Sequence, residues 1–192
     1  RIDLGGGLGI PYKEDDAPAP PSDYAAMIAD VTQDLGVQVI LEPGRVITGN
    51  AGVMLSTVLY EKAAPETDFL IIDAGMNDLM RPALYDAHHD ILPIKQAGAG
   101  AERKTYDVVG PICESTDKFA KARELTALRP GQRIAFMSAG AYGAVLSSTY
   151  NARPLVPEVL VNGSSFDVVR RRPEFEEMIA LEKVPDWLTQ KA

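Results

Sequence analysis

The order of elements in the first 45 residues constrains the fold most. Ile2–Leu4 reads as a strand that runs into the glycine loop Gly5–Gly9, and Val37–Leu41 reads as a second, wholly apolar strand that ends in the turn Glu42–Arg45. The segment between them repeats apolar residues at helical spacing, at Tyr24, Met27, Ile28, Val31 and Leu35. A strand, a helix and a strand in this order form a βαβ unit, so the sequence predicts a parallel sheet here.

The character of the sequence changes after Gly52. Runs of strand-forming residues, separated by Gly, Pro and Asp, follow at Val53–Lys62, Phe69–Asp73, Lys104–Val109, Arg133–Met137 and Phe166–Arg171. Helical patterns are expected only near Asp117–Leu128 and Glu174–Leu181. Many strands with few helices favour an antiparallel sandwich or barrel. The predicted fold class is therefore α/β plus all-β, with a domain boundary near Asn50 that separates residues 1–50 from 51–192.

Charge and cysteine content narrow the classes of function. The formal net charge is −8 at pH 7, which argues against nucleic-acid or anionic-membrane partners because both need a basic face. No apolar run reaches the roughly 18 residues of a membrane span. Cys113 is the single cysteine, so an intrachain disulfide is excluded and a cytoplasmic location is expected. Because Arg1 leads directly into a strand, we expect the chain to be a piece of a longer protein.

Two turns at the same edge of the predicted parallel sheet are candidates for binding a cofactor. The backbone N–H groups of Gly6, Gly7 and Gly9 can converge on an anion, because glycine leaves the space open. In the neighbouring turn, Glu42 can hold a protonated ring nitrogen and Arg45 an anionic group. The alternatives are an ordinary glycine turn and a surface ion pair.

Arg81 and Tyr85 stand four residues apart, so one short helical turn, with Pro82 at its first position, would present both to a carboxylate. The pair His88 and His89 follows, but adjacent histidines point in different directions and no partner stands at metal-ligand spacing. We therefore expect no metal site.

Two further turns carry reactive side chains. Cys113 and Glu114 lie in a Gly-Pro turn with other polar residues, which suits a proton donor and a receptor for an ammonium group better than a core position. Tyr142 stands between glycines, where its hydroxyl can reach an anion. An inert cysteine and a packing tyrosine remain the alternatives.

Taken in order, five motifs resemble the C-terminal half of a known family. They are GGGLGI, EPGR, DAGMNDLMRPALY, GPICESTD and GAYG. Together they resemble the alanine-racemase-like, fold-type III amino-acid decarboxylases that depend on pyridoxal 5′-phosphate. The resemblance covers Ile2 to about Asn151. It implies that residues 1–50 are the last strands of a TIM barrel and that residues 51–192 are a C-terminal β domain with short helices. The last part of this β domain can pack against the barrel.

The resemblance also assigns roles, residue by residue. Gly6, Gly7 and Gly9 would bind the cofactor phosphate, Glu42 the pyridinium nitrogen, and Tyr142 the phosphate or ring. Arg45 would face both the phosphate and the substrate carboxylate. Arg81 and Tyr85 would bind the carboxylate that is not lost, Cys113 would protonate the carbanion, and Glu114 would receive an amino group. In this family the last two reach into a neighbouring subunit, which implies a homodimer.

One part of the family pattern is missing. No lysine of this chain matches the Schiff-base lysine, so the resemblance implies a missing N-terminal portion that carries it, and this chain alone is predicted to be inactive. Within the family, the closest resemblance is to the members that convert meso-2,6-diaminopimelate to L-lysine in lysine biosynthesis, because Arg81 and Tyr85 beside Glu114 suit a second amino-acid group. An ornithine or arginine decarboxylase and a non-catalytic relative remain alternatives.

Overall fold

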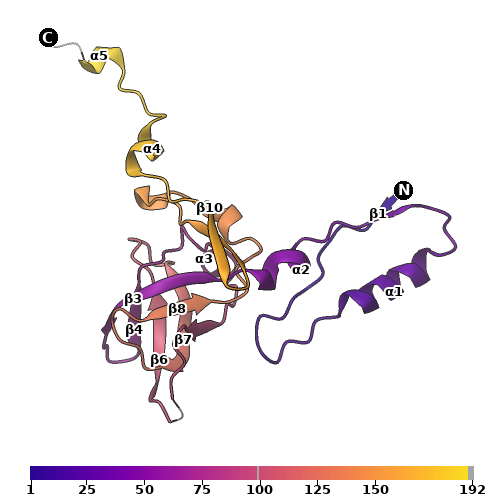
Figure 1. Cartoon of the computed structure of the whole chain (residues 1–192), viewed down its shortest axis with the longest axis horizontal. Helices are drawn as coiled ribbons and strands as arrows, with labels where there is room; N and C mark the ends of the chain where they lie inside the picture. Colours follow the sequence, from indigo (N-terminus) through magenta and orange to yellow (C-terminus); the bar gives the residue numbers. More distant parts are fainter. Residues whose placement is uncertain (99, 190–192) are drawn as a thin grey trace. The chain divides into compact units, whose positions relative to one another are not determined.

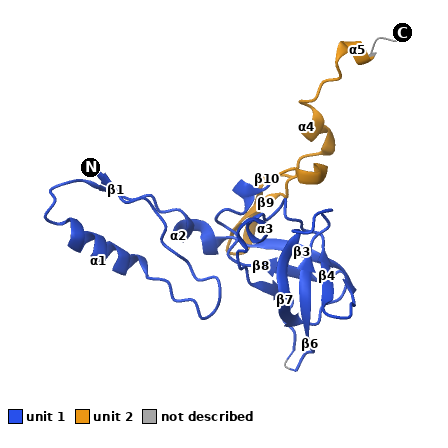
Figure 2. Cartoon of the chain, turned by 180° about the vertical axis from the view of Figure 1, so that it is seen from behind, with its two compact units in different colours: residues 1–147 blue, residues 148–192 orange. Residues whose placement is uncertain are grey.

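The structure, a computed structural model, describes residues 1–98 and 100–189, and these fall into two compact units, residues 1–147 and 148–192 (Figures 1 and 2). The first unit contains one six-stranded sheet and a small parallel strand pair. The second contains a strand hairpin and two short helices. Of the helices described, none is both long and apolar enough to cross a lipid bilayer.

The predicted βαβ unit is present at the start of the chain. Strand β1 (Ile2–Asp3) pairs in parallel with β2 (Val39–Ile40), and helix α1 (Pro21–Thr32) connects them. Pro21 opens the helix, where the missing N–H has no cost. Gly36 adopts a positive φ of 61° in the turn that leads to β2. Helices α2 (Arg45–Thr48) and η1 (Gly49–Ala51) then lead into the sheet.

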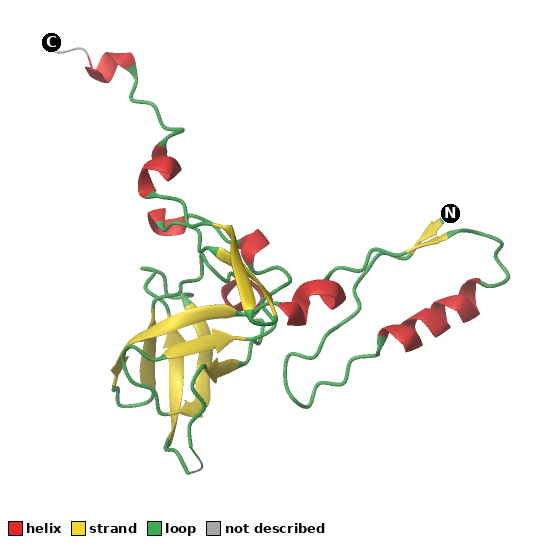
Figure 3. Cartoon of the chain, in the orientation of Figure 1, coloured by secondary structure: helices red, strands yellow, loops and turns green. Residues whose placement is uncertain are grey.

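The six-stranded sheet has the order β5-β8-β3-β4-β6-β7, and its strands are drawn in yellow in Figure 3. Their bounds are β3 (Met54–Lys62), β4 (Asp68–Ile72), β5 (Ile91–Pro93), β6 (Arg103–Val109), β7 (Lys118–Thr126) and β8 (Arg133–Phe136). All neighbours are antiparallel except β4 and β6, which run in parallel. The outer strands β5 and β7 contact each other, so the sheet curls into a nearly closed barrel. The expected antiparallel sheet is thus a mixed one.

Alternating side chains of these strands fill the interior of the curled sheet. The fully buried members of the core include Leu70, Ile72, Tyr106, Ile134 and Phe136. The rings of Phe119 and Phe136 pack with their centroids 4.7 Å apart. This core supports the connection between β4 and β5, which contains α3 (Arg81–Tyr85).

The prediction of a helix near Asp117–Leu128 is wrong, because Lys118–Thr126 forms strand β7. The segment is rich in Lys, Ala, Arg, Glu and Leu, which are strong helix formers. Pairing with β6 overrides this preference, since it buries Phe119 and Leu125 while the charged side chains remain outside on an edge strand. A positive φ of 46° at Ala122 accompanies a register shift, which further disguises the alternation.

The second unit contains β9 (Glu158–Asn162) and β10 (Ser165–Arg170), an antiparallel hairpin, together with α4 (Phe175–Ile179) and α5 (Asp186–Thr189). Strand β10 and helix α4 confirm the predictions for Phe166–Arg171 and Glu174–Leu181 to within two residues at either end. Strand β9 was not expected. The short helices η2 (Ala144–Leu146) and η3 (Tyr150–Ala152) lie on either side of the division between the units.

Candidate functional site

The glycine loop and the Glu42–Arg45 turn lie side by side at the carboxyl ends of β1 and β2. Glu42 donates its backbone N–H to the Gly5 carbonyl oxygen at 2.8 Å. Gly6 approaches the Glu42 backbone so closely that an added Cβ would stand 2.2 Å from the Glu42 carbonyl oxygen. Glycine is therefore required at position 6 by the neighbouring turn, and the predicted adjacency of the two motifs is present.

The glycine loop has the properties of an anion cradle. Gly5 and Gly7 have positive φ values of 67° and 92°. Among the described residues, no acceptor is bound by the N–H groups of Gly6, Gly7 or Gly9. N–H groups without an acceptor, on glycines that leave the backbone open, suit a phosphate. The cofactor role of these glycines remains a prediction.

Arg45 lies between two tyrosine rings. Its guanidinium carbon is 5.9 Å from the ring centroid of Tyr142 and 5.9 Å from that of Tyr12. The Tyr142 hydroxyl also lies next to Gly44, where an added Cβ would be 3.3 Å from it. Tyr142 itself has a positive φ of 58°, an uncommon conformation that turns its side chain toward this site. Tyr142, which is far from the Glu42–Arg45 turn in the sequence, thus lies beside Gly44 and Arg45 of that turn.

Arg81 is held in a buried environment at the start of α3. Only 6% of the residue is exposed, and its guanidinium carbon lies 5.0 Å from the Tyr12 ring centroid. Arg81 Nη1 is 3.1 Å from Nε2 of His89, a residue that is fully buried. Tyr85, on the same helix, is instead 63% exposed. The two predicted carboxylate ligands therefore differ sharply in how firmly the surrounding structure holds them.

Tyr12 and His89 were not predicted as site residues, yet Tyr12 contacts Arg45 and Arg81, and His89 contacts Arg81. The Tyr12 ring meets the His89 ring edge-on, with centroids 5.7 Å apart. The Tyr12 hydroxyl is buried and has no hydrogen-bond partner among the described residues, so a polar group is expected to face it. Tyr12 stands only three residues after the glycine loop, in the sequence GIPY, but no local pattern indicates that its ring would face Arg45 and Arg81.

Cys113 and Glu114 lie on an exposed loop whose base is fixed by Asp117. The buried Asp117 carboxylate accepts hydrogen bonds from the backbone N–H of Met76 at 2.7 Å and of Ile112 at 2.6 Å. This joins the Cys113 loop to the loop that precedes Arg81. Within the part of the chain that the structure describes, neither Cys113 nor Glu114 contacts the cluster of Tyr12, Arg45, Arg81, His89 and Tyr142.

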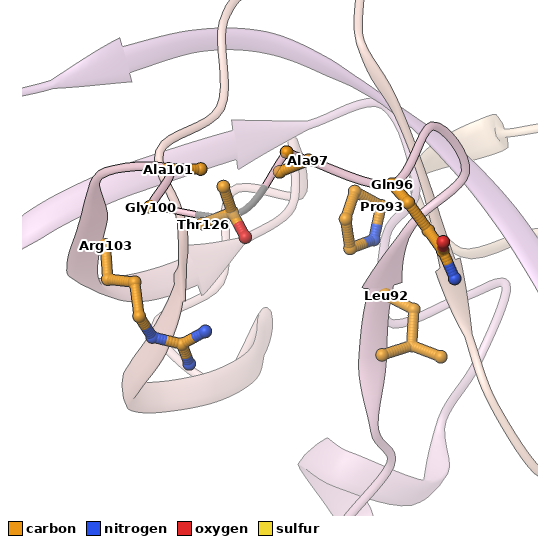
Figure 4. A pocket seen from close by; sticks show the side chains of 9 residues that line it. Leu92, Pro93, Gln96, Ala97, Gly100, Ala101, Arg103 and Thr126 are labelled. Carbon is orange, nitrogen blue, oxygen red and sulfur yellow. The ribbon is translucent and has the colours of Figure 1, made fainter.

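A pocket of about 440 Å³ lies elsewhere on the sheet, between β5, the β5–β6 connection and the ends of β6 and β7 (Figure 4). Leu92, Pro93, Gln96, Arg103 and Thr126 are among its lining residues. None of the predicted site residues lines it, and the Arg103 guanidinium already pairs with Glu124. The pocket therefore has no converging catalytic groups. In the described ranges, no group of three or more His, Cys, Asp or Glu side chains is arranged to hold a metal ion.

Comparisons with known proteins match most of the chain. Residues 15–140 match the family described as pyridoxal-dependent decarboxylase, C-terminal sheet domain. A diaminopimelate decarboxylase of Zymomonas mobilis is 47% identical over 188 residues, which cover 97% of this chain and 44% of the relative. The chain thus spans less than half the length of that relative.

Two solved structures share the fold of the chain. Diaminopimelate decarboxylase from M. jannaschii in complex with L-lysine has a TM-score of 0.91 at 37% identity and is matched over 97% of this chain and 43% of its own. The Helicobacter pylori enzyme complexed with L-lysine has a TM-score of 0.85 at 42% identity, over 94% of this chain and 44% of its own.

Proposed function

The chain belongs to the pyridoxal-dependent decarboxylase family, and from that premise we propose that it forms part of an enzyme that decarboxylates meso-2,6-diaminopimelate to L-lysine. This reaction would be the last step of lysine biosynthesis. The activity is assigned to the full-length protein, because this chain spans about 44% of the Zymomonas relative. The diaminopimelate decarboxylases of M. jannaschii and H. pylori, which were solved with L-lysine, support the substrate class.

The observation that carries the proposal is the buried, unneutralised guanidinium of Arg81. In residues 1–98 and 100–189, no acidic side chain forms an ion pair with it. A buried charge without a counter-ion is costly, so an anionic ligand is expected to complete the site. Diaminopimelate has a carboxylate at the end that does not react, whereas ornithine has only an ammonium group there. Arg81 and Tyr85 can bind the carboxylate of diaminopimelate, and Glu114 can bind the amino group beside that carboxylate.

The residues present fit pyridoxal 5′-phosphate as the cofactor. The open N–H groups of Gly6, Gly7 and Gly9 suit its phosphate, and the Tyr142 hydroxyl and Arg45 lie beside the same turn. Glu42 is exposed at this edge and would keep the ring nitrogen protonated. When bound, the cofactor supplies an electron sink for the negative charge that departing CO2 leaves on the α-carbon.

Two residues of this chain would handle the proton and the amino group. Cys113 is exposed on its loop and would donate a proton to the α-carbon after CO2 leaves. Glu114, next to it, would bind the substrate ammonium. Because neither residue contacts the Arg81 cluster in the described chain, we propose that they serve the site of a second subunit, in a homodimer with shared active sites. The Schiff-base lysine would come from the N-terminal portion of the full-length protein, and we place the enzyme in the cytoplasm.

The test is CO2 release from meso-diaminopimelate, ornithine, arginine and lysine, with added pyridoxal phosphate. It is run on the full-length protein and on this chain alone. We expect release from diaminopimelate only, and only with the full-length protein. In the full-length protein, Cys113→Ala should retain cofactor absorbance and lose turnover. Thr116→Ala on the same loop is the matched control, because the Thr116 hydroxyl contacts the Met76 sulfur.

Other outcomes assign other functions. Release from ornithine or arginine instead would mean that Arg81 and Tyr85 do not select a second carboxylate. No release from any substrate would favour a non-catalytic relative that kept the fold. Unchanged turnover of Cys113→Ala would remove the proton-donor role from that residue while leaving the substrate assignment intact.

A further inference from the structure

His89 makes two hydrogen bonds that together define which of its ring nitrogens carries the proton. Nδ1 is 2.8 Å from the Met137 carbonyl oxygen, and Nε2 is 3.1 Å from Arg81 Nη1. A carbonyl oxygen only accepts, so Nδ1 must carry the hydrogen. Nε2 then has a free lone pair and accepts from the guanidinium. A neutral imidazole in this tautomer satisfies both partners, whereas a protonated ring would direct an N–H against the N–H of Arg81.

The surroundings of His89 favour that neutral state. Burial lowers the pKa of the imidazole below its usual value of 6.5, and the positive charges of Arg81, His88 and Arg123 lower it further, against the opposing effect of the Met137 carbonyl. The charged and titratable groups near the ring include those three residues, Tyr12, whose ring meets it edge-on, and Asp90, which pairs with His88 at 2.7 Å and with Arg123 at 3.7 Å. Arg123 also donates to the His89 carbonyl oxygen at 3.1 Å, which fixes the backbone.

Among the described residues, the groups that contact the Arg81 guanidinium are therefore neutral. His89 accepts one of its N–H groups, and the Tyr12 ring lies 5.0 Å from the guanidinium carbon. An acidic residue in the place of His89 would orient the guanidinium equally well, but it would also neutralise the charge. The neutral acceptor leaves the positive charge available for a ligand. Only one guanidinium nitrogen is used by the imidazole, and the other N–H groups remain for a planar carboxylate.

We infer that His89 is a positioning residue that holds the Arg81 guanidinium, with its charge unneutralised, for the substrate carboxylate that is retained in the product. The inference rests on the proposed function and deepens it, since it explains how this chain distinguishes a ligand with a distal carboxylate from one without. It also accounts for the contact between a fully buried histidine and a nearly buried arginine that forms no ion pair with an acid among the described residues.

The experiment uses the full-length protein and two substitutions of His89. His89→Asn keeps an N–H donor near the position of Nδ1 for the Met137 carbonyl but removes the acceptor for Arg81. His89→Gln reaches the position of Nε2 and can restore that acceptor. His88→Asn is the matched control, because His88 bonds to Asp90 and Arg123 and forms none of the hydrogen bonds described for Arg81. The measurements are kcat and KM for meso-diaminopimelate, and inhibition by L-lysine and by 1,5-diaminopentane, which lacks the carboxylate.

We expect His89→Asn to raise KM and the L-lysine inhibition constant by about 10-fold or more, the effect of losing a hydrogen bond to a charged group. Inhibition by 1,5-diaminopentane should change by less than about 3-fold, because it does not use Arg81. His89→Gln should return both L-lysine inhibition and KM to within about 3-fold of the wild type. His88→Asn should change none of them.

Each contrary result has a separate meaning. If the wild type releases no CO2 from diaminopimelate, the proposed function is wrong, and the assigned ligand with it. If the wild type is active and His89→Asn alters only thermal stability, or weakens both inhibitors equally, the positioning role is overturned and the function stands. If His89→Asn does not fold, His89→Gln decides: selective loss of L-lysine inhibition in that variant overturns the role, and retention supports it.

Discussion

The segment 1–50 and the sheet region 53–147 both supply site residues, but they bury their apolar side chains to very different extents. In the sheet region the interior is continuous, with Leu70, Ile72 and Phe136 fully buried. In segment 1–50, Ile28 of α1 is buried, but other apolar side chains of this helix are exposed, including Met27, which is 53% exposed, and Val31. Strands β1 and β2 each contain only two residues.

This difference indicates what fixes each half of the site. Arg81 is positioned by a packed core and by side-chain hydrogen bonds. The glycine loop is joined to the Glu42–Arg45 turn by the backbone hydrogen bond from Glu42 to Gly5 at 2.8 Å. The segment after Arg45 is joined to the sheet region where Gly140 donates to the Gly49 carbonyl oxygen at 3.0 Å and Ala139 donates to the Gly52 carbonyl oxygen at 2.8 Å. We therefore expect substitutions in the sheet region to act on global stability. Those in segment 1–50 should act mainly on the local geometry of the anion cradle.

The largest expected effect is a difference in unfolding free energy between a substitution in the sheet region and one in segment 1–50. Phe136→Ala, in the core, should lower the free energy of unfolding of this chain by about 3–5 kcal/mol, the usual cost of removing a buried ring. Met27→Ala, on the exposed face of α1, should change it by less than about 0.5 kcal/mol. Urea denaturation followed by circular dichroism measures both. A Met27→Ala cost close to that of Phe136→Ala would show that α1 belongs to the same cooperative core.

The sequence predicted those strands that carry a local burial pattern, and it missed those that depend on tertiary pairing. The strands whose burial alternates, such as β3 and β4, lie within one residue of their predicted bounds, since the period-two pattern records which face is buried. Strand β7 was predicted as a helix because its residues favour helix and its pairing with β6 is tertiary. Strand β5 is only three residues long and carries too little pattern to be recognised.

In the candidate site, the sequence predicted which turns lie side by side at the ends of parallel strands. It did not predict contacts between side chains that depend on tertiary packing. The glycine loop and Glu42 follow neighbouring strands, so their meeting at one edge follows from the βαβ order. His89 was considered only as a metal ligand, and its contact with Arg81 depends on how α3 and Met137 pack in the folded chain. Nothing in the sequence around Tyr12 indicates the two guanidinium groups beside its ring.

The next effect tests the junction between the two regions. A Cβ at Gly140 would stand 1.9 Å from the Thr48 carbonyl oxygen, so Gly140→Ala must displace backbone. We expect a loss of about 1–3 kcal/mol in unfolding free energy and weaker pyridoxal phosphate binding by the full-length protein, because the Arg45 turn and Tyr142 separate. Gly98→Ala is the control, since no atom lies within 4 Å of the added group. Cofactor binding that survives Gly140→Ala would show that this junction does not position the cradle.

A matched pair of aspartates gives a smaller effect. Asp117, which is 3% exposed, and Asp16, which is fully exposed, each accept two backbone N–H groups through the carboxylate. Asp117→Asn should destabilise the chain by about 1–2 kcal/mol, because a backbone N–H is left without a strong acceptor in the interior. Asp16→Asn should shift the urea midpoint only slightly, since water replaces the carboxylate. Equal shifts in urea midpoint for Asp117→Asn and Asp16→Asn would mean that the burial of Asp117 does not raise the cost of losing its carboxylate.

The smallest expected effect is a pH dependence that originates in the sheet region. Burial holds the pKa of His89 in the folded chain below 6.5, so between that depressed value and 6.5 the unfolded chain binds the extra proton. Stability is therefore complete above pH 6.5 and decreases as the pH falls through the folded pKa, by at most about 1.4 kcal/mol per pH unit for one proton. The carboxyl groups with lowered pKa, Asp16, Asp73 and Glu177, have ordinary values of 3.8, 3.8 and 4.5, so they act only at lower pH. Unfolding free energies measured between pH 7.5 and about 5 should thus decrease with falling pH. This slope should be absent in His89→Asn and present in His88→Asn. An unchanged slope in His89→Asn would mean that another group titrates.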